Sequence, residues 1–418
     1  MATTLAYGES IECLCELGFI VREFTLNTST LNGTDVLDGT LEGVDVSPYL
    51  FSATISRGRT NQFDPVKAGV CELVLNNNDR RFDPINTSSP YYDSTTGRSG
   101  VVPRRKVSLT SGANHLFTGR ILDVDVVYNV NGTSEVVLTC ADDFNLLGSV
   151  YFSSDVTPTS QLSGARVTAV LDRSDVNYPV SSRNIATGTQ TLGAQQINQG
   201  TTALAYLQKV AETEQGLFYV AADGTLTFTD RVTNTFSSPA VTFSDAGTVG
   251  TAKYSGLSVI YGSDFLYNRI QITRDGGTTQ NATDSASITE FGTSTLDFSG
   301  LLFNEDSQSS TLASYLLNLY KEPEYRFDDV AVPAHSLTDT VRNNANALEL
   351  GAIVAVVKSY NTGTPSSVTQ EYEVGGIQHR ITPSTHEILF RIRPAQLVYA
   401  FILNDATYGI LDADNALT

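Results

Sequence analysis

Short strand-like segments, several of them with alternating apolar and polar residues, follow one another between residues 46 and 148. The segments YLFSATISRG (49–58) and VCELVLNN (70–77) have this period of two, which is typical of β-strands with one buried face. A longer run turns at Asn131-Gly132, a dipeptide that favours a tight hairpin. Closely spaced antiparallel strands of this kind predict a barrel or a sandwich.

The pattern changes after residue 148, where helical spacing begins. SQLSGARVTAVLDRSD (160–175) and GTTALAYLQKVAETEQG (200–216) both predict helices. The second helix can be capped at its start by Thr201 or Thr202, and Gly216 is expected to be its left-handed C-terminal residue. A hairpin turned at Asp223-Gly224 follows at once, so the region predicts a small α+β unit.

Strands return after residue 240, with two interruptions. Residues 277–300 are rich in Thr, Ser and Asn and are interpreted as a loop. The segment SSTLASYLLNLYKEP predicts a helix over 309–322 that ends before Pro323, because proline cannot donate the helical hydrogen bond. The order along the chain is therefore β, α+β, β.

A chain of 418 residues is too long for one ordinary core, which predicts two to four compact units. The expected fold class is mainly β with a smaller α+β insertion. The predicted divisions are an N-terminal extension (1–45), a first β domain (46–148), an α+β decoration (149–240), a second β domain with the helix 309–322 (241–397) and a C-terminal peptide (398–418).

The composition narrows the function. Hydrophobic residues make up 41% of the chain and charged residues 17%, as in folded proteins. The formal net charge of −19 argues against a duplex-binding surface, because that affinity comes from Lys and Arg on phosphates. Two explanations of the acidic surface stay open: it provides solubility, or it lines a wall that repels passing DNA.

The four cysteines do not predict a disulfide framework or a metal site. Cys13 and Cys15 lack a second Cys/His pair at finger spacing, and Cys71 and Cys140 lie in apolar strands, where a free buried thiol is usual. The first 20 residues contain no secretory signal, and no run has the ~18–20 apolar residues of a membrane span. A soluble protein made in the cytosol is expected.

The strand 70–75 ends in a polar segment, NNNDRRFDP (76–84), which we call the Asn-Arg knot. Its oxygens suggest a calcium loop, but the spacing of such a loop is absent and two arginines lie among them. A tied turn is the better interpretation, since Asn and Asp side chains bond to nearby amides. Phe82 is expected in the core, and Arg80 or Arg81 is expected to pair with Asp64, Asp79 or Asp83.

Catalytic signatures are missing from the sequence. The four histidines form no H-E-x-x-H motif, and neither a G-x-S-x-G elbow nor a phosphate loop is present. Acids are plentiful enough for a glycosidase pair, but none stands isolated in an apolar pattern. We therefore expect no enzyme activity, no catalytic or metal-ligating residues and no cofactor.

The segment SRGRTNQFDPVKAGVCELVLNNNDRRFDP (56–84) resembles a signature of minor tail proteins from long-tailed bacteriophages, of the baseplate-hub type. The helix-hairpin segment 203–231, the closing strands 372–394 and the terminal peptide 401–417 resemble the same family in the same order. The matching signature residues are Gly58, Arg59, Asp64, Ala68, Gly69, Asn77, Asp79, Arg81, Phe82, Asp83 and Pro84.

The resemblance implies a homotrimer with two tube-type antiparallel β-barrel domains in each chain and α+β decorations between them. The implied function is structural: a hub in the virion, at the distal end of the tail, that closes the tail tube and opens for DNA ejection. The implied partners are the tail tube or a distal tail protein ring, the tape measure protein and tail fibres or receptor-binding proteins. No sequence-specific nucleic acid binding and no stable membrane insertion are implied, and assembly takes place in the host cytoplasm.

Two other functions stay open. A receptor- or carbohydrate-binding protein of the tail tip is compatible with 19 tyrosines and 19 phenylalanines, although these are spaced as core residues. A tail-associated cell-wall hydrolase is the third candidate, with its site expected within 150–240. For the hub, residues 27–47, 277–300 and 400–418 are expected to become ordered against neighbouring proteins.

Overall fold

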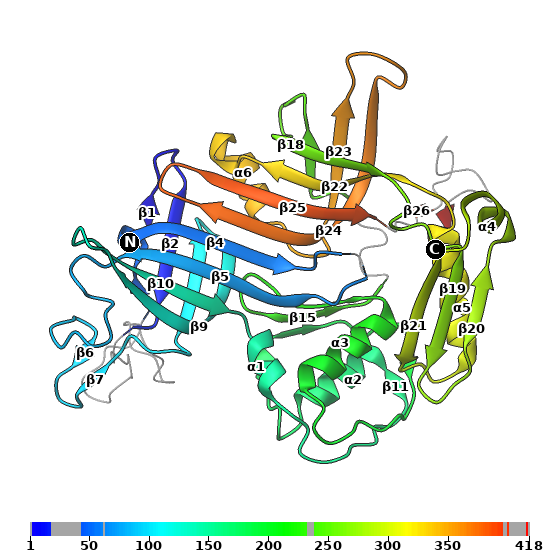
Figure 1. Cartoon of the computed structure of the whole chain (residues 1–418), viewed down its shortest axis with the longest axis horizontal. Helices are drawn as coiled ribbons and strands as arrows, with labels where there is room; N and C mark the ends of the chain where they lie inside the picture. The colour runs from blue at the N-terminus through cyan, green and yellow to red at the C-terminus, as the bar shows by residue number, and fades with distance from the viewer. Residues whose placement is uncertain are drawn as a thin grey trace.

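The computed structural model describes residues 2–17, 43–61, 63–231 and 238–395, and the backbone of 399–400 and 415–416. The fold is mainly β, with one large curled sheet and a few helices, as the sequence predicts (Figure 1). No helix in this described part of the chain is both long enough and apolar enough to cross a membrane. Most of the segments 27–47 and 400–418 lies outside the described residues.

The first half of the sheet has the strand order β1-β2-β8-β9-β10-β5-β4. β3 pairs with β2, and the chain then passes through the short helix η1 (Ser47–Tyr49) into β4, so the row of strands curls back on itself. The strands are β1 (Thr3–Thr4), β2 (Ser10–Cys15), β3 (Val44–Asp45), β4 (Leu50–Gly58), β5 (Lys67–Asn76), β8 (Lys106–Ser111), β9 (Asn114–Tyr128) and β10 (Ser134–Ala141).

The predicted alternation explains the core of this half. In β5, Cys71, Leu73 and Leu75 are buried, whereas Val70 and Glu72 are exposed. All four cysteines are free and buried, which was expected for Cys71 and Cys140. The turn between β9 and β10 is confirmed at Asn131-Gly132, with a positive φ of 87° at the glycine. Residues 10–15, assigned from the sequence to an N-terminal extension, form β2 and pair with β8.

The second half of the sheet has the order β18-β22-β25-β24-β23-β16-β17. β17 and β18 are separated by only two residues, so the chain itself brings the two ends of this row together. The strands are β16 (Val241–Ser244), β17 (Ala252–Lys253), β18 (Gly256–Tyr261), β22 (Tyr325–Val332), β23 (Ile353–Ser359), β24 (Ser367–Ile381) and β25 (His386–Pro394).

One long strand joins the halves. Residues 367–373 of β24 pair with β23, and residues 376–381 pair with β4 of the first half. At the change of partner, Gly58 has a φ of 99°, and a Cβ there would lie 2.4 Å from the carbonyl oxygen of Gly375. Only glycine fits this close approach of two backbones.

The α+β unit packs below the sheet (Figure 1). Thr202 caps α3 by accepting from the Ala205 amide at 3.1 Å, as predicted. The expectation for Gly216 is wrong, because the left-handed residue is Gln215, with a φ of 57°. Gly216 is needed for another reason: a Cβ there would lie 2.0 Å from the Thr229 carbonyl oxygen. The elements are α1 (Phe144–Ser149), β11 (Gln161–Leu162), α2 (Ser163–Leu171), β12 (Arg183–Ile185), β13 (Thr191–Leu192), α3 (Ala203–Glu214), β14 (Leu217–Val220) and β15 (Leu226–Thr229).

The interpretation of residues 277–300 as a loop is wrong. These residues contain β20 (Gln280–Thr283), α4 (Ser285–Phe291) and most of β21 (Thr295–Leu301). β20 and β21 pair with β19 (Arg269–Arg274) in a three-stranded sheet. The Asp284 side chain caps the start of α4 by accepting hydrogen bonds from the backbone amides of Ala286 and Ser287, each at 3.0 Å. The helix α5 (Asp306–Tyr320) covers this sheet, beginning three residues earlier than predicted because Glu305 and Gln308 form a capping box.

The remaining short elements are β6 (Tyr92–Asp93), β7 (Arg98–Ser99), η2 (Val180–Ser182), η3 (Ala334–Ser336), α6 (Asp339–Asn346), β26 (Tyr399–Ala400) and β27 (Asn415–Ala416).

Candidate functional site

The Asn-Arg knot is organised by Asn77 at the end of β5, which is fully buried. Its backbone amide donates to the Ser134 carbonyl at 2.9 Å, and its side-chain oxygen accepts from the Phe82 amide at 2.9 Å. Its own carbonyl accepts from the Arg80 amide at 2.8 Å. One asparagine therefore fixes the end of β5, the start of β10 and the turn that follows.

Phe82 is fully buried beside this turn. Its ring stacks on Tyr91, with centroids 5.8 Å apart, and meets Tyr49 edge-on at 5.6 Å. Pro84 follows in the turn and is half-buried. The ring anchors the loop 77–91 to the core of the first half.

Each arginine of the knot has an acid close by in sequence. Arg81 pairs with Asp79 at 2.5 Å, and its guanidinium lies 4.0 Å from the centroid of the Tyr49 ring. Arg80 pairs with Asp83 at 2.7 Å. Although burial opposes it, the bonds that Asp83 accepts from Tyr128 and Arg80 hold its pKa below the usual range.

Asp64, the third acid expected near these arginines, lies elsewhere and accepts from the Asn61 side chain at 2.9 Å. Within the described residues, no group of three or more His, Cys, Asp or Glu side chains could hold a metal ion. The knot therefore has the geometry of a tied turn.

Gly69, another signature residue, lies against a buried acid. Its amide donates to Asp142 Oδ2 at 2.6 Å, and a Cβ at this position would lie 2.7 Å from that oxygen. Burial raises the pKa of Asp142 to about 7, against the two backbone bonds that it accepts. Nearby, Arg57 of β4 pairs with Glu349 at 2.9 Å, which ties the first half of the sheet to the second.

A buried polar chain lies at the same junction. His386 Nδ1 contacts Glu9 Oε2 at 2.8 Å, and His386 Nε2 contacts His379 Nδ1 at 3.0 Å. All three side chains are at most 2% exposed. Burial and the neighbouring His386 lower the pKa of His379 well below its usual value. This enclosed chain joins β24 and β25 to the N-terminal hairpin, and sequence spacing gave no signal for Glu9 as the partner.

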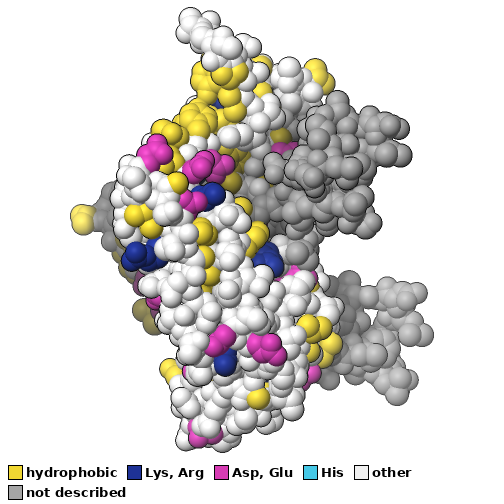
Figure 2. Space-filling view, turned by 90° about the vertical axis from the view of Figure 1, so that its right-hand side faces the viewer, with side chains coloured by type: hydrophobic (Ala, Val, Ile, Leu, Met, Phe, Trp, Pro, Cys, Tyr) yellow, Lys and Arg dark blue, Asp and Glu magenta, His cyan; other side chains and the backbone are white. Residues whose placement is uncertain are grey.

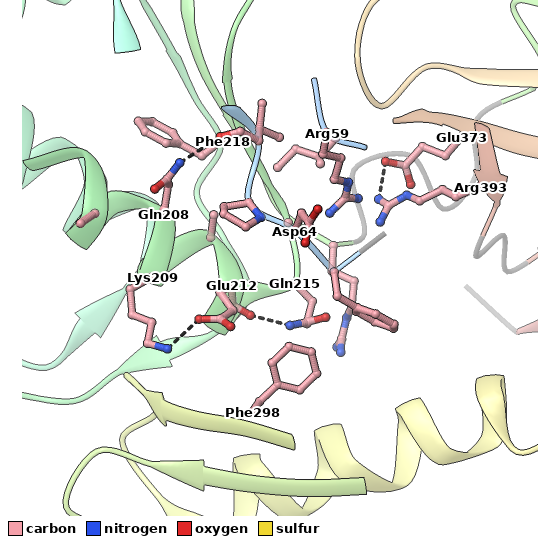
Figure 3. A pocket seen from close by; sticks show the side chains of 18 of the residues that line it. Arg59, Asp64, Gln208, Lys209, Glu212, Gln215, Phe218, Phe298, Glu373 and Arg393 are labelled. Carbon is pink, nitrogen blue, oxygen red and sulfur yellow. Dashed lines mark hydrogen bonds and ion pairs between the residues drawn. The ribbon is translucent and has the colours of Figure 1, made fainter. Parts of the chain in front are cut away.

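Arg59 and Asp64 take part in a different feature, a pair of adjoining cavities of about 250 and 520 Å³. They lie where the β4–β5 connection meets the middle of β24 and the end of β25. The smaller cavity has α3 on one side and the three-stranded unit with α5 on the other (Figure 3). Four residues line both cavities: Arg59, Phe63, Asp64 and Arg393.

Some charged side chains around these cavities form ion pairs, whereas Arg59 forms none within the described residues. Arg393 bonds to Glu373 at 2.5 Å, and Lys209 bonds to Glu212 at 2.7 Å. Figure 3 shows the guanidinium of Arg59 next to that of Arg393. Burial and this neighbouring charge lower the pKa of Arg59 to about 9. The sequence motif Gly58-Arg59 did not predict these cavities, because most of the residues that line them come from segments distant in sequence.

The outer surface shows one further feature on β18, which pairs only with β22 among the described strands. Val259 and Tyr261 on this edge strand are 42% and 68% exposed. Figure 2 shows hydrophobic atoms gathered over the upper part of one face, with acidic and basic side chains scattered below. An edge strand with exposed apolar residues is suited to pairing with another chain.

Comparison with known proteins identifies solved structures with a similar fold. No protein-family model and no curated protein matches the sequence. A solved tail protein from Neisseria meningitidis MC58 matches 85% of this chain and 94% of its own length, with 12% identity and a TM-score of 0.56. The 43 kDa tail protein of prophage MuSo2 from Shewanella oneidensis matches 93% of this chain and 99% of its own length, also with 12% identity and a TM-score of 0.56. The chain therefore shares the fold of these tail proteins over most of its length.

Proposed function

We propose that this protein is a structural, non-enzymatic component of a phage tail: a baseplate hub at the distal end of the virion tail. It closes the tail tube, contacts distal tail proteins or fibres, and opens for DNA ejection. The observation that carries the proposal is the similarity in fold to two tail proteins, which covers 85% and 93% of this chain. The signature at residues 56–84 supports the same placement.

The location in the particle is the decisive test. Gold-labelled antibodies against the protein should bind intact virions at the tail end farthest from the head. Label along the whole tube or on the head contradicts a hub. Cross-linking of virions should connect the protein to the tube or a distal ring, to the tape measure protein and to fibre proteins.

The proposed assembly is a homotrimer, and the edge of β18 is the surface that we propose for its contacts. A charge on this edge opposes strand pairing between chains. Val259→Lys should therefore convert the trimer to monomers in mass measurements of the native particle component. Val180, 75% exposed on η2, offers a matched control: Val180→Lys should stay trimeric. A wild-type monomer contradicts the proposal.

The net charge of −19 is proposed to contribute to a channel through which DNA passes without adhering. An electrostatic map of the assembled ring, from its experimental structure, tests this point. An acidic lumen agrees with the proposal, whereas a neutral or basic lumen leaves only solubility as the explanation of the charge.

A further inference from the structure

The larger cavity, of about 520 Å³, is lined by arginines from separate parts of the chain. Arg59 comes from the β4–β5 connection, Arg326 from β22, and Arg391 and Arg393 from β25. The wall between them includes the aromatic residues Phe63, Phe265 and Tyr267. The volume is within the range of small-molecule sites. The lining is rich in charged residues, with the aromatic rings between them.

Several guanidinium donors in this wall are enclosed and have no hydrogen-bond partner within the described part of the chain. They are Nε and Nη2 of Arg59, Nη2 of Arg326 and Nε of Arg393. The Arg326 residue is 6% exposed, and its guanidinium lies 3.9 Å from the centroid of the Phe265 ring. Enclosed donors without acceptors are unfavourable, so the wall is suited to a ligand that brings acceptor oxygens.

The two unpartnered donors of Arg59, Nε and Nη2, are on the same edge of its guanidinium. Elsewhere in the protein, Arg173 uses this edge to bind both oxygens of Asp175, at 3.0 and 2.9 Å. A planar carboxylate matches two parallel N–H groups in this way. The open edge of Arg59 therefore has the shape of a carboxylate receptor.

The acids around the cavity indicate how much charge the ligand carries. Asp64 and Asp264 line it, and Asp64 accepts from Asn61. Glu373, which lines the adjoining smaller cavity, is already bonded to Arg393. Asp328 and Asp329 also line the cavity and oppose a doubly charged phosphate. A single negative charge complements the open donors of Arg59 and Arg326 better.

We propose that this cavity binds a carboxylate attached to a ring, with Arg59 gripping both carboxylate oxygens, Arg326 donating a third bond and the aromatic wall contacting the ring. An aromatic acid and an acidic sugar both have this chemistry. Because the donors are enclosed, the ligand reaches them by displacing side chains of the wall. The inference is independent of the proposed role in a tail.

Titration calorimetry on the full chain, with benzoate and glucuronate as the two probes, tests the proposal. Benzyl alcohol and glucose are the neutral controls, and inorganic phosphate tests shape and charge. We expect binding of at least one acid and none of its neutral control. Preference for benzoate identifies an aromatic acid, and preference for glucuronate identifies an acidic sugar.

Variants connect binding to the two arginines. Arg59→Gln should weaken acid binding by about tenfold or more, because bonds to a charged group are lost. Arg59→Lys keeps the charge but not the paired donors, and should also weaken it. Arg326→Gln provides a second reading if Arg59 variants fold poorly. Arg98→Gln, at an exposed arginine on β7, is the matched control and should bind normally.

Four results overturn the proposal. If neither acid binds, the donors are satisfied by water. If glucose or benzyl alcohol binds as well as its acid, the cavity recognises the ring and not the carboxylate. If phosphate binds more tightly than both acids, or if Arg59→Gln and Arg326→Gln bind as the wild type does, the assigned geometry is wrong.

Discussion

The Asn-Arg knot and the arginine-lined cavity use the same residue types in opposite ways. In the knot, Arg80 and Arg81 pair with Asp83 and Asp79, only two or three residues away. In the cavity, Arg59 and Arg326 retain enclosed N–H groups without partners in the described chain. In the knot, both arginines have acid partners and stabilise a turn. In the cavity, unpartnered N–H groups remain available to a ligand.

The largest expected contrast concerns the aromatic anchors. Phe82→Ala should lower the free energy of unfolding by about 3–5 kcal/mol, because it empties a fully buried site. Phe63→Ala, in the partly buried cavity wall, should lower it clearly less. Urea unfolding of both variants measures the difference. Equal losses of unfolding free energy in the two variants contradict the difference in packing between the knot and the cavity wall.

The next effect tests Asn77. Asn77→Ala removes the acceptor of the Phe82 amide, and leaving a buried donor unsatisfied should cost about 1–3 kcal/mol of unfolding free energy. The same urea experiment applies. Asn184→Ala, at an exposed position on β12, is the control and should stay within about 0.5 kcal/mol of the wild type.

The cavity should respond with the opposite sign. Arg59→Met replaces enclosed, unpartnered donors with an apolar chain, so stability should be unchanged or higher by about 1 kcal/mol. Thermal unfolding checks this expectation. A loss as large as that of Asn77→Ala indicates that Arg59 is a structural residue, like those of the knot.

The smallest effect is a pH dependence of the knot. The folded-state pKa of Asp83 is lowered, so its contribution to stability is present above its ordinary pKa and is lost as the pH falls below it. Asp83→Asn should therefore destabilise the protein at neutral pH and flatten the decline of stability with acidification. An unchanged acid profile contradicts the pairing with Arg80 and Tyr128.

The features that the sequence predicts are those with local causes. Alternation placed the strand of Cys71, Leu73 and Leu75, and the Asn131-Gly132 turn placed a hairpin. The elements within 277–300 were missed because their exposed, polar residues hide the hydrophobic period. Asp284 before a short polar run was the signal that could have located α4.

The parts that could not be predicted depend on residues distant in sequence. Glu9 meets His386 across 377 positions, and the open cavity gathers Arg59, Arg326 and Arg393 from three strands or connections. Without a common motif, only the folded backbone brings such groups together. The knot was visible in the sequence for the opposite reason, since its two ion pairs and the bond between Asn77 and Phe82 join residues no more than five positions apart.

The shared strand β24 has a mechanical consequence. Residues 376–381 bond to β4 on one edge and to β25 on the other. A pull that separates the two halves along the strand direction loads this ladder in shear, where all its bonds resist together. A pull across the strands opens them one after another at a much lower force. A motion driven along the strand direction should therefore keep the two halves together and place its flexing outside the β4–β24 seam.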